Sequence, residues 1–234
     1  MTEMMLETKN LCKTFRKRSV VQNISLSVPK NAIYGLLGPN GAGKSTTLKM
    51  ITGMLIPTSG EIYFDSHKWT RQDLHSIGAL IESPPLYENL TARENLLVRT
   101  TVLGLPKSRI DEVLHVVELE NTDRKKAREF SMGMKQRLGI AIALLNHPKF
   151  LILDEPMNGL DPFGIQELRK LILSFPAKGI TVILSSHILS EVSQIADHVG
   201  IISGGVLGYQ GKLNKDDDLE DLFVQVAGKY RREA

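Results

Sequence analysis

The spacing of hydrophobic positions changes twice along the chain and divides it into three parts. Short, nearly continuous apolar runs come first, at Val20–Pro29 and Ala32–Leu37, and they are typical of buried strands. Helical spacing dominates from Thr91 to Leu145, and strand-like runs return from Phe150 onward. The pattern therefore predicts an α/β protein with an all-helical insertion.

The same reasoning places the individual elements. Further strands are expected at residues 61–66, 76–81, 150–154, 181–186, 198–203 and 205–211. Helices are expected at residues 44–55, 91–97, 109–119, 130–145, 164–175, 188–196 and 218–227. In the first of these helices Leu48, Ile51 and Leu55 share a face, and Thr91 begins the second as an N-cap with Glu94 three residues on. Strands that alternate with helices predict a mostly parallel sheet that is covered on both faces.

Composition is that of an ordinary globular protein. The 234 residues are 42% hydrophobic and 24% charged, and the net charge of +3 is too small to indicate a nucleic-acid partner. The single cysteine, Cys12, allows no disulfide within the chain and favours a reducing compartment. No apolar run approaches the roughly 18 residues needed to cross a bilayer, and the acidic N-terminus is unlike a signal peptide. If the protein works at a membrane, we expect another chain to provide the membrane span.

A glycine-rich segment, GPNGAGKST at residues 38–46, lies between a predicted buried strand and a predicted helix. It matches G-x-x-x-x-G-K-[ST], a loop whose backbone N–H groups surround a phosphate while the helix N-terminus adds positive potential. Lys44 is expected to reach the β- and γ-phosphates, and the Ser45 hydroxyl to ligate Mg²⁺. The alternative is a glycine-rich turn that happens to end in Lys-Ser. The residues predicted to bind the nucleotide here are Gly38, Asn40, Gly41, Gly43, Lys44, Ser45 and Thr46.

Titratable side chains are predicted at the ends of two later strands. FLILDEP brings Asp154 and Glu155 to a strand end, which faces the ligand crevice in an open α/β sheet. Asp154 is placed to hold Mg²⁺, and Glu155 to orient and deprotonate an attacking water. His187, at the tip of the next strand, is placed to hydrogen-bond the γ-phosphate or that water. The simpler interpretations are an acidic pair that ends a strand and a structural histidine. With the phosphate loop, these residues predict a nucleotide hydrolase.

A second phosphate-binding feature is expected in the helical insertion. Ser131 and Gly133 lie in FSMGMKQR at the start of a predicted helix, and a helix N-terminus with a free serine hydroxyl is a phosphate site. We expect these residues to lie far from Lys44 in their own chain. Two copies packed head to tail would bring Ser131 of one copy against the nucleotide of the other.

The motifs GPNGAGKST, FSMGMKQR, FLILDEP, NGLDP and SSH, in this order along essentially the whole chain, resemble those of the ATP-binding subunits of ABC transporters. The resemblance implies a single ATPase domain over residues 1–234. It would comprise a P-loop NTPase (RecA-like) core, an N-terminal antiparallel β-subdomain and a helical subdomain inserted at about residues 86–147. The implied ligands are ATP and Mg²⁺. The implied partners are a second copy or a homologous ATPase, and integral membrane permease subunits on the cytoplasmic face of a bacterial plasma membrane.

Several residues take their predicted roles from this resemblance. Phe15 matches the aromatic residue that stacks on adenine, and Ser131 and Gly133 match the signature residues that complete the partner's site. Gly159–Asp161 matches the loop through which the two subunits contact each other. The family signature reads Leu-Ser-Gly-Gly-Gln, and this chain departs from it with Phe130, Met132 and Met134 at the first, third and fifth positions. The larger side chain of Met132 affects how closely that loop can approach the partner's ATP.

Glu82 stands where the family usually has a glutamine that reaches Mg²⁺ and the attacking water, in a loop that senses the membrane subunit. A carboxylate remains a good Mg²⁺ ligand, so Glu82 is predicted to join Ser45 and Asp154 at the metal and to take part in catalysis. The alternative is a Gln-to-Glu change without consequence. Glu82, the Met-rich signature and HILSEVSQIADHVGII resemble a subgroup of ABC ATPases. These drive separately encoded permeases that remove lantibiotics or bacitracin-type peptides from the membrane and so give immunity or resistance.

Three other functions stay open at this point. One is export of a different amphiphile, such as a drug or a lipid. Another is a non-transport ABC ATPase acting on ribosomes, DNA or iron–sulfur assembly. Those acting on ribosomes usually fuse two ATPase units, and those acting on DNA carry a long coiled coil. This chain has one ATPase unit and no heptad array. The last is a regulatory P-loop GTPase, which would need no Ser131 signature and would not use Glu155.

Overall fold

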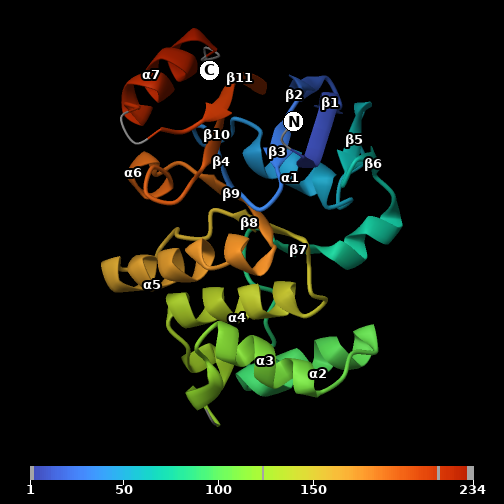
Figure 1. Cartoon of the computed structure of the whole chain (residues 1–234), viewed down its shortest axis with the longest axis vertical. Coiled ribbons are helices and arrows are strands. Elements are labelled where there is room, and N and C mark those ends of the chain that lie inside the picture. Colours follow the sequence, from blue (N-terminus) through green and yellow to red (C-terminus); the bar gives the residue numbers. More distant parts are fainter. Residues whose placement is uncertain (1–2, 123, 215–216, 231–234) are drawn as a thin grey trace.

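The computed structural model describes residues 3–122, 124–214 and 217–230, and it contains two β-sheets with helices packed around them (Figure 1). The larger sheet has the strand order β11-β10-β4-β9-β8-β7. Its strands are β4 (Ile33–Leu37), β7 (Ile77–Leu80), β8 (Phe150–Asp154), β9 (Thr181–Ser186), β10 (His198–Ser203) and β11 (Val206–Lys212). All neighbours in this sheet run parallel except β11, which pairs antiparallel with β10. The prediction of an α/β fold with a mostly parallel sheet is confirmed.

The smaller sheet is antiparallel and comes from the N-terminal part of the chain. Its strands are β1 (Met4–Phe15), β2 (Arg18–Ile24), β3 (Ser27–Pro29), β5 (Ser59–Phe64) and β6 (His67–Lys68). The hydrophobic pattern predicted neither β1 nor β6. The twelve residues of β1 alternate irregularly between buried and exposed positions, with register shifts against β2, β3 and β5. The regular period-2 signal of a half-buried strand is therefore missing.

The single strand predicted at residues 20–29 is two strands, β2 and β3. Thr8 of β1 causes the break. Its hydroxyl donates to the Ile24 carbonyl (2.8 Å) and accepts from the Leu26 amide (2.8 Å), so a side chain replaces one step of the backbone ladder. The sequence of residues 20–29 alone does not show that the Thr8 side chain interrupts the backbone pairing at this point.

Helix α1 (Lys44–Ile51) follows the phosphate loop but ends four residues before the predicted end at Leu55. Gly53 adopts φ 69°, a left-handed conformation that stops helices, and the Leu55 amide turns back to the Lys49 carbonyl (3.0 Å). Leu55 still packs against the hydrophobic core, although it lies outside the helix. The apolar spacing therefore indicated the buried face correctly but not the end of the helix.

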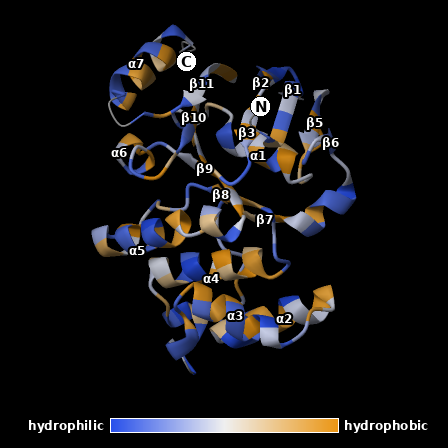
Figure 2. Cartoon of the chain, viewed as in Figure 1, coloured by the Kyte–Doolittle hydropathy of each residue, from blue (hydrophilic) through white to orange (hydrophobic). Residues whose placement is uncertain are grey.

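Three α-helices of the described residues lie between β7 and β8 in the chain: α2 (Ala92–Leu103), α3 (Ser108–Val116) and α4 (Met132–Leu144). Figure 1 shows α2 and α3 at the end of the molecule farthest from the small sheet, with α4 between them and α5. In Figure 2 the hydrophobic residues of these helices gather where the helices meet. The predicted face of α3 is buried, with Ile110, Val113, Leu114 and Val117 at most 3% exposed. Thr91 caps α2 in the predicted capping box with Glu94.

The remaining helices cover the rest of the large sheet. They are α5 (Pro162–Leu173), α6 (Leu189–Val192) and α7 (Leu219–Lys229). Helix α6 is much shorter than the predicted 188–196, because Asp197 exchanges two hydrogen bonds with Ile33 (2.8 Å each) and so draws the chain into β10. Helix α7 lies against the β10–β11 side, where the Ser203 hydroxyl donates to the Ala227 carbonyl (3.2 Å). Among the described residues, no helix is both long and apolar enough to cross a bilayer.

Candidate functional site

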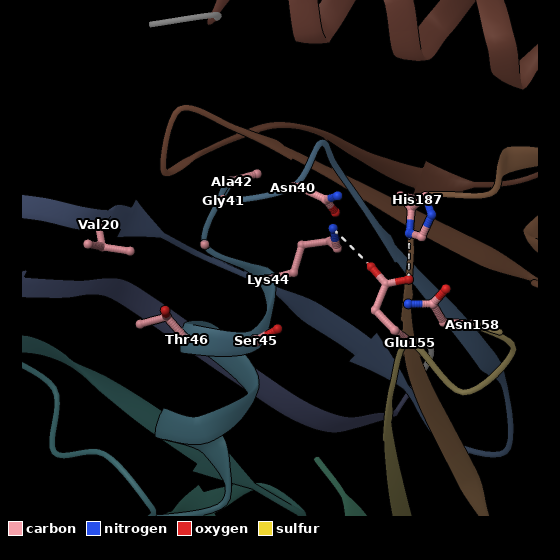
Figure 3. A pocket seen from close by; sticks show the side chains of 11 residues that line it. Val20, Asn40, Gly41, Ala42, Lys44, Ser45, Thr46, Glu155, Asn158 and His187 are labelled. Carbon is pink, nitrogen blue, oxygen red and sulfur yellow. Dashed lines mark hydrogen bonds and ion pairs between the residues drawn. The ribbon is translucent and has the colours of Figure 1, made fainter. Parts of the chain in front are cut away.

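The glycine-rich loop joins β4 to α1 and encloses a pocket of about 260 Å³ (Figure 3). Gly41 and Gly43 have φ values of 77° and 108°, which residues with a side chain rarely adopt. Gly43 is the N-cap of α1, so the first amides of that helix are directed toward the pocket region without a side-chain cap. The pocket is lined by Val20, Asn40, Gly41, Ala42, Gly43, Lys44, Ser45, Thr46, Glu155, Asn158 and His187.

Lys44 folds back across the loop from the first turn of α1. Its ammonium group donates to the carbonyls of Gly38 (2.7 Å) and Pro39 (3.4 Å). Its side chain is only 5% exposed, although a buried ammonium group is costly unless it has polar partners. The loop therefore holds a desolvated positive charge at the wall of the pocket.

A carboxylate from the opposite wall neutralises this charge. Glu155 Oε1 lies 3.2 Å from Lys44 Nζ, and Glu155 Oε2 lies 2.8 Å from His187 Nδ1. Figure 3 shows Glu155 between these two partners, so three predicted site residues from three strand ends meet in one network. The backbone of Glu155 has φ 49°, an uncommon conformation for a residue with a side chain.

Asp154 lies just behind this wall and is 2% exposed. Its Oδ1 atom accepts hydrogen bonds from the hydroxyls of Ser45 (3.1 Å) and Ser185 (2.5 Å). Ser185 stands opposite Asp154 in the register of β8 and β9, and its hydroxyl also accepts from the Glu155 amide (2.9 Å). Asp154 is thereby fixed against the start of α1.

The donors around Ser45 fit a small hard cation that shares its coordination with a ligand. Ser45 and Asp154 offer hydroxyl and carboxylate oxygens 3.1 Å apart. Across the described residues, no group of three or more His, Cys, Asp or Glu side chains forms a site made of protein alone. Mg²⁺ commonly binds through one or two protein oxygens together with phosphates and water. The Ser45 hydroxyl and the Asp154 carboxylate provide protein oxygens of this kind.

Phe15 does not line the pocket. It ends β1 with 43% of its surface exposed, and Lys13 Nζ lies 5.1 Å from the centre of its ring. Phe15 pairs with Arg18 at the turn into β2, the strand that carries the pocket residue Val20. The β1–β2 hairpin, which forms one side of the pocket through Val20, thus leaves part of the Phe15 ring exposed.

Ser131 and Gly133 lie at the start of α4, in the helical part of the chain. Ser131 is the N-cap, and its hydroxyl oxygen accepts from the Met134 amide (3.2 Å), which leaves the O–H able to donate to a ligand. A helix needs its first amides satisfied, and this serine serves that purpose. Neither residue lines the pocket of its own chain, as predicted for a site that another copy would use. The neighbouring Met132 is 54% exposed.

Glu82 also lies outside the pocket lining. It follows β7 with φ 62°, its side chain is 67% exposed, and it forms an ion pair with Lys49 of α1. Lys49 is four residues after Ser45, and positions i and i+4 of a helix lie one above the other on the same face. Glu82 is therefore held about one helical turn from the Ser45 hydroxyl.

Three further site residues escaped the sequence reasoning: Val20, Asn158 and Ser185. Val20 reaches the pocket only through the pairing of the small sheet, which was not predicted in detail. Asn158 follows Glu155 in a turn in which its amide donates to the Glu155 carbonyl (3.1 Å). Ser185 lies two residues before His187 in a predicted strand, so its contact with Asp154 would follow from knowing that β8 and β9 are neighbours.

A phosphate loop between a buried strand and a helix, faced by carboxylates at the end of β8, the second strand along the sheet from β4, defines a P-loop nucleotide-binding protein. A family model described as "ABC transporter" matches residues 21–158. The chain therefore belongs to the ABC transporter family, as an ATPase subunit with the P-loop NTPase fold that the motifs predicted.

Individual relatives agree with this assignment. The chain is 51% identical to the lantibiotic transport ATP-binding protein SrtF of Streptococcus pyogenes, over 94% of this chain and 96% of SrtF. It is 49% identical to the bacitracin transport ATP-binding protein BcrA of Bacillus licheniformis, over 86% of this chain and 68% of BcrA. A solved dimeric structure of an ATP-binding cassette in a post-hydrolysis state, bound to ADP and Pi, superposes with a TM-score of 0.78 at 26% identity, covering 90% and 99% of the two chains.

Proposed function

We propose that this chain powers a bacterial exporter that removes an antimicrobial peptide of the lantibiotic or bacitracin type from the membrane. The observation that carries the proposal is the 51% identity to a lantibiotic transport ATP-binding protein along nearly the full length of both chains. Such a role requires permease subunits within the membrane and places the ATPase on the cytoplasmic face of the plasma membrane. We assign no nucleic-acid partner, and residues 1–234 act as one ATPase domain with a helical subdomain at about 86–147.

In this proposal ATP binds between Phe15 and the phosphate loop. The exposed ring of Phe15 stacks on adenine, while the loop amides and Lys44 hold the phosphates. The γ-phosphate takes the place that Glu155 has beside Lys44, since both are anions and Lys44 is the buried cation they share. The loop residues with this role are Gly38, Asn40, Gly41, Gly43, Lys44, Ser45 and Thr46.

Ser45 and Asp154 would hold Mg²⁺. The ion supplies positive charge for the β- and γ-phosphate oxygens. Ser185 keeps Asp154 in place through its hydroxyl, which donates to the carboxylate at 2.5 Å. The part-buried hydrogen bond between Ser45 and Asp154 (3.1 Å) supports this pair as the metal site.

Glu155 orients and deprotonates the attacking water, and His187 stabilises the γ-phosphate geometry. The 2.8 Å contact between His187 and Glu155 supports a shared role. Once Lys44 turns to the phosphate, the Glu155 carboxylate loses its ammonium partner and becomes available to accept a proton from water.

A second copy, or a homologous ATPase, completes each site. Ser131 and Gly133 of one chain would meet the nucleotide of the other in a head-to-tail dimer, with Gly159–Asp161 in the contact between them. The exposure of Met132 and the absence of Ser131 from its own pocket support this arrangement.

Glu82 is proposed as a further ligand of Mg²⁺ and as a contributor to catalysis, in a loop that faces the permease. Its ion pair with Lys49 keeps the carboxylate near the α1 face that carries Ser45. To reach the ion, Glu82 must exchange Lys49 for Mg²⁺ by rotating its side chain. The exposed ion pair opposes this exchange only weakly, because surface pairs typically contribute about 0–1 kcal/mol.

The decisive experiment expresses the chain with the permease genes next to it in a sensitive bacterium. The inhibitory concentrations of lantibiotics and of bacitracin are then measured, with Glu155→Gln as the control. We expect the concentration to rise for at least one such peptide and the rise to vanish in the control. No rise for any peptide, with ATPase activity intact, would contradict the peptide assignment and favour export of another amphiphile, such as a drug or a lipid.

A further inference from the structure

The segment Pro84–Thr91 connects the Glu82 loop to α2, and a buried amide holds it. Asn95 of α2 is 1% exposed. Its Oδ1 atom accepts from the Tyr87 amide (2.8 Å), and its Nδ2 atom donates to the carbonyls of Tyr87 (3.1 Å), Leu90 (3.3 Å) and Thr91 (2.9 Å). One side chain therefore satisfies four backbone groups of a segment with no regular secondary structure.

The other edge of this segment pairs with residues 126–128. Thr91 and Lys126 form an antiparallel β-bridge. Beside it, the Ala127 amide donates to the Leu90 carbonyl (2.8 Å) and the Arg128 amide to the Glu88 carbonyl (3.0 Å). The segment is thus fixed between the Asn95 side chain on one edge and backbone hydrogen bonds on the other.

Residues 126–128 lead directly into the signature. They enter a short 3-10 helix (Ala127–Glu129), then the buried Phe130 and the N-cap Ser131. Lys135, in the first turns of α4, makes a second connection through its ion pair with Glu88 (3.1 Å). Any displacement of the segment is therefore passed to the start of α4 by two routes.

The beginning of the segment packs closely on the same helix. A Cβ atom placed on Gly139 of α4 would lie only 2.9 Å from Pro84 Cβ, so the Pro84 ring packs directly against the backbone of α4 at this glycine. The segment consequently touches α4 near Gly139 and again, through residues 126–131, at its start. It is attached to the helical part of the chain along its whole length.

We propose that Asn95 is a positioning residue that fixes the segment Pro84–Thr91 to the helical part, so that the Glu82 loop and the start of α4 at Ser131 move as one piece. Asn95 touches neither the phosphate loop nor Glu155 and acts only through the segment. A displacement of the Glu82 loop would then also displace Ser131, the residue that we assign to the partner's nucleotide.

The proposal is tested first by amide hydrogen exchange of the full chain without nucleotide. Asn95→Leu keeps the volume but removes the Oδ1 acceptor of the Tyr87 amide and the Nδ2 donor to the three carbonyls. We expect exchange at Tyr87, Ala127, Arg128 and Met134 to rise about tenfold, the effect of losing roughly one hydrogen bond's stabilisation. Exchange at Val182, whose amide bonds to Ala32 in the large sheet, should stay unchanged.

The matched control is Thr100→Val. Thr100 is a buried polar residue of the same helix, 1% exposed, but its hydroxyl donates only to Leu97 of its own helix (3.1 Å). We expect no rise at Ala127, Arg128 or Met134 in this variant. A rise in Asn95→Leu that is confined to Tyr87, or an equal rise in both variants, would overturn the proposal.

Asn95→Asp serves if the leucine variant does not fold. It keeps the acceptor for the Tyr87 amide and loses the donor to the carbonyls of Tyr87, Leu90 and Thr91. We expect exchange to rise at Ala127 and Met134 but not at Tyr87. Unchanged exchange at Ala127 and Met134 would again contradict the link.

A kinetic measurement, which rests on the proposed ATPase function, gives a second test. We expect Asn95→Leu to lower kcat about tenfold and to leave KM for ATP within about twofold, because the phosphate loop is untouched while Ser131 is misplaced. A wild-type kcat would contradict the proposal. If the wild-type chain hydrolyses no ATP, the proposed function fails, whereas the exchange result still decides the role of Asn95.

Discussion

The phosphate-loop side and the helical side of this molecule are organised in opposite ways. On the first, Lys44, Glu155 and His187 form one network of contacts, and Ser45 is hydrogen-bonded to Asp154 beside it. On the second, Ser131 caps its own helix and, like Gly133, stays outside the pocket of its own chain, next to an exposed Met132. One half of the proposed active site is preformed, and the other half is presented outward. The difference predicts that substitutions in the first half change nucleotide binding or turnover within one chain. Substitutions in the second half should change turnover only when two chains are assembled.

The largest effect is expected from Glu155→Gln. Without a carboxylate to accept the proton of the attacking water, turnover should fall by about 10²–10⁴-fold, while nucleotide binding is preserved. The variant should remain as an ATP-bound dimer, observable by light scattering after size-exclusion chromatography. Hydrolysis at the wild-type rate would exclude this role for Glu155 and remove the main chemical residue from the preformed half.

Lys44→Ala should weaken nucleotide binding about tenfold to hundredfold. The substitution removes the buried ammonium group, and hydrogen bonds to charged groups contribute roughly 1.5–3 kcal/mol. Binding of a fluorescent ATP analogue is measured in the presence of EDTA, so that only the protein holds the phosphates. Lys49→Ala is the control, since it removes the same charge from the same helix outside the pocket; an equal loss there would show that net charge alone is responsible.

Ser131→Ala tests the outward half. We expect nucleotide binding to the single chain to be unchanged and kcat to fall about tenfold at protein concentrations where dimers form. The substitution also costs about 1 kcal/mol of helix stability, because the N-cap of α4 is lost. Asp218→Ala, which removes the N-cap of α7 and leaves the segment Pro84–Thr91 intact, is the control for that loss. If both variants lose the same activity, the effect of Ser131 is on stability only.

Glu82 lies between the two halves and should show the smallest effect. We expect Glu82→Ala to lower kcat several-fold and to impair export, and Glu82→Gln to have a milder effect because an amide oxygen can still ligate the cation. ATPase assays across Mg²⁺ concentrations measure this, with Glu61→Ala as a control carboxylate that pairs with Lys68 away from the pocket. Equal activity of all Glu82 variants would show that the Gln-to-Glu change has no consequence.

How much of this could be predicted from the sequence depended on whether the information was local. The phosphate loop, the Asp154–Glu155 pair and the capping box at Thr91 each lie within a few residues, and the structure has all three features where they were expected. Apolar runs such as β8 and β9 gave the strands of the large sheet, because strands buried on both faces are apolar throughout.

Features that depend on distant pairing were missed. Strand β1 has an irregular burial pattern and is defined by its pairing with β2, β3 and β5. The role of Ser185 requires the register of β8 and β9, and the Glu82–Lys49 ion pair requires the packing of β7 beside α1. The N-cap role of Ser131, whose hydroxyl oxygen accepts from the Met134 amide, was also missed.

The pair formed by Lys44 and Glu155 also bears on which anions the protein can retain. A carboxylate that is tethered to the same chain has an effective concentration in the millimolar range or above, whatever the dilution of the protein. A single phosphate or sulfate ion must compete with it for Lys44 and can contact fewer loop amides than a triphosphate. In the proposed binding mode a nucleoside triphosphate also contacts Phe15 through its base, and so can displace the tethered group. The protein therefore carries an intramolecular competitor that favours long polyphosphate ligands over the small anions around it.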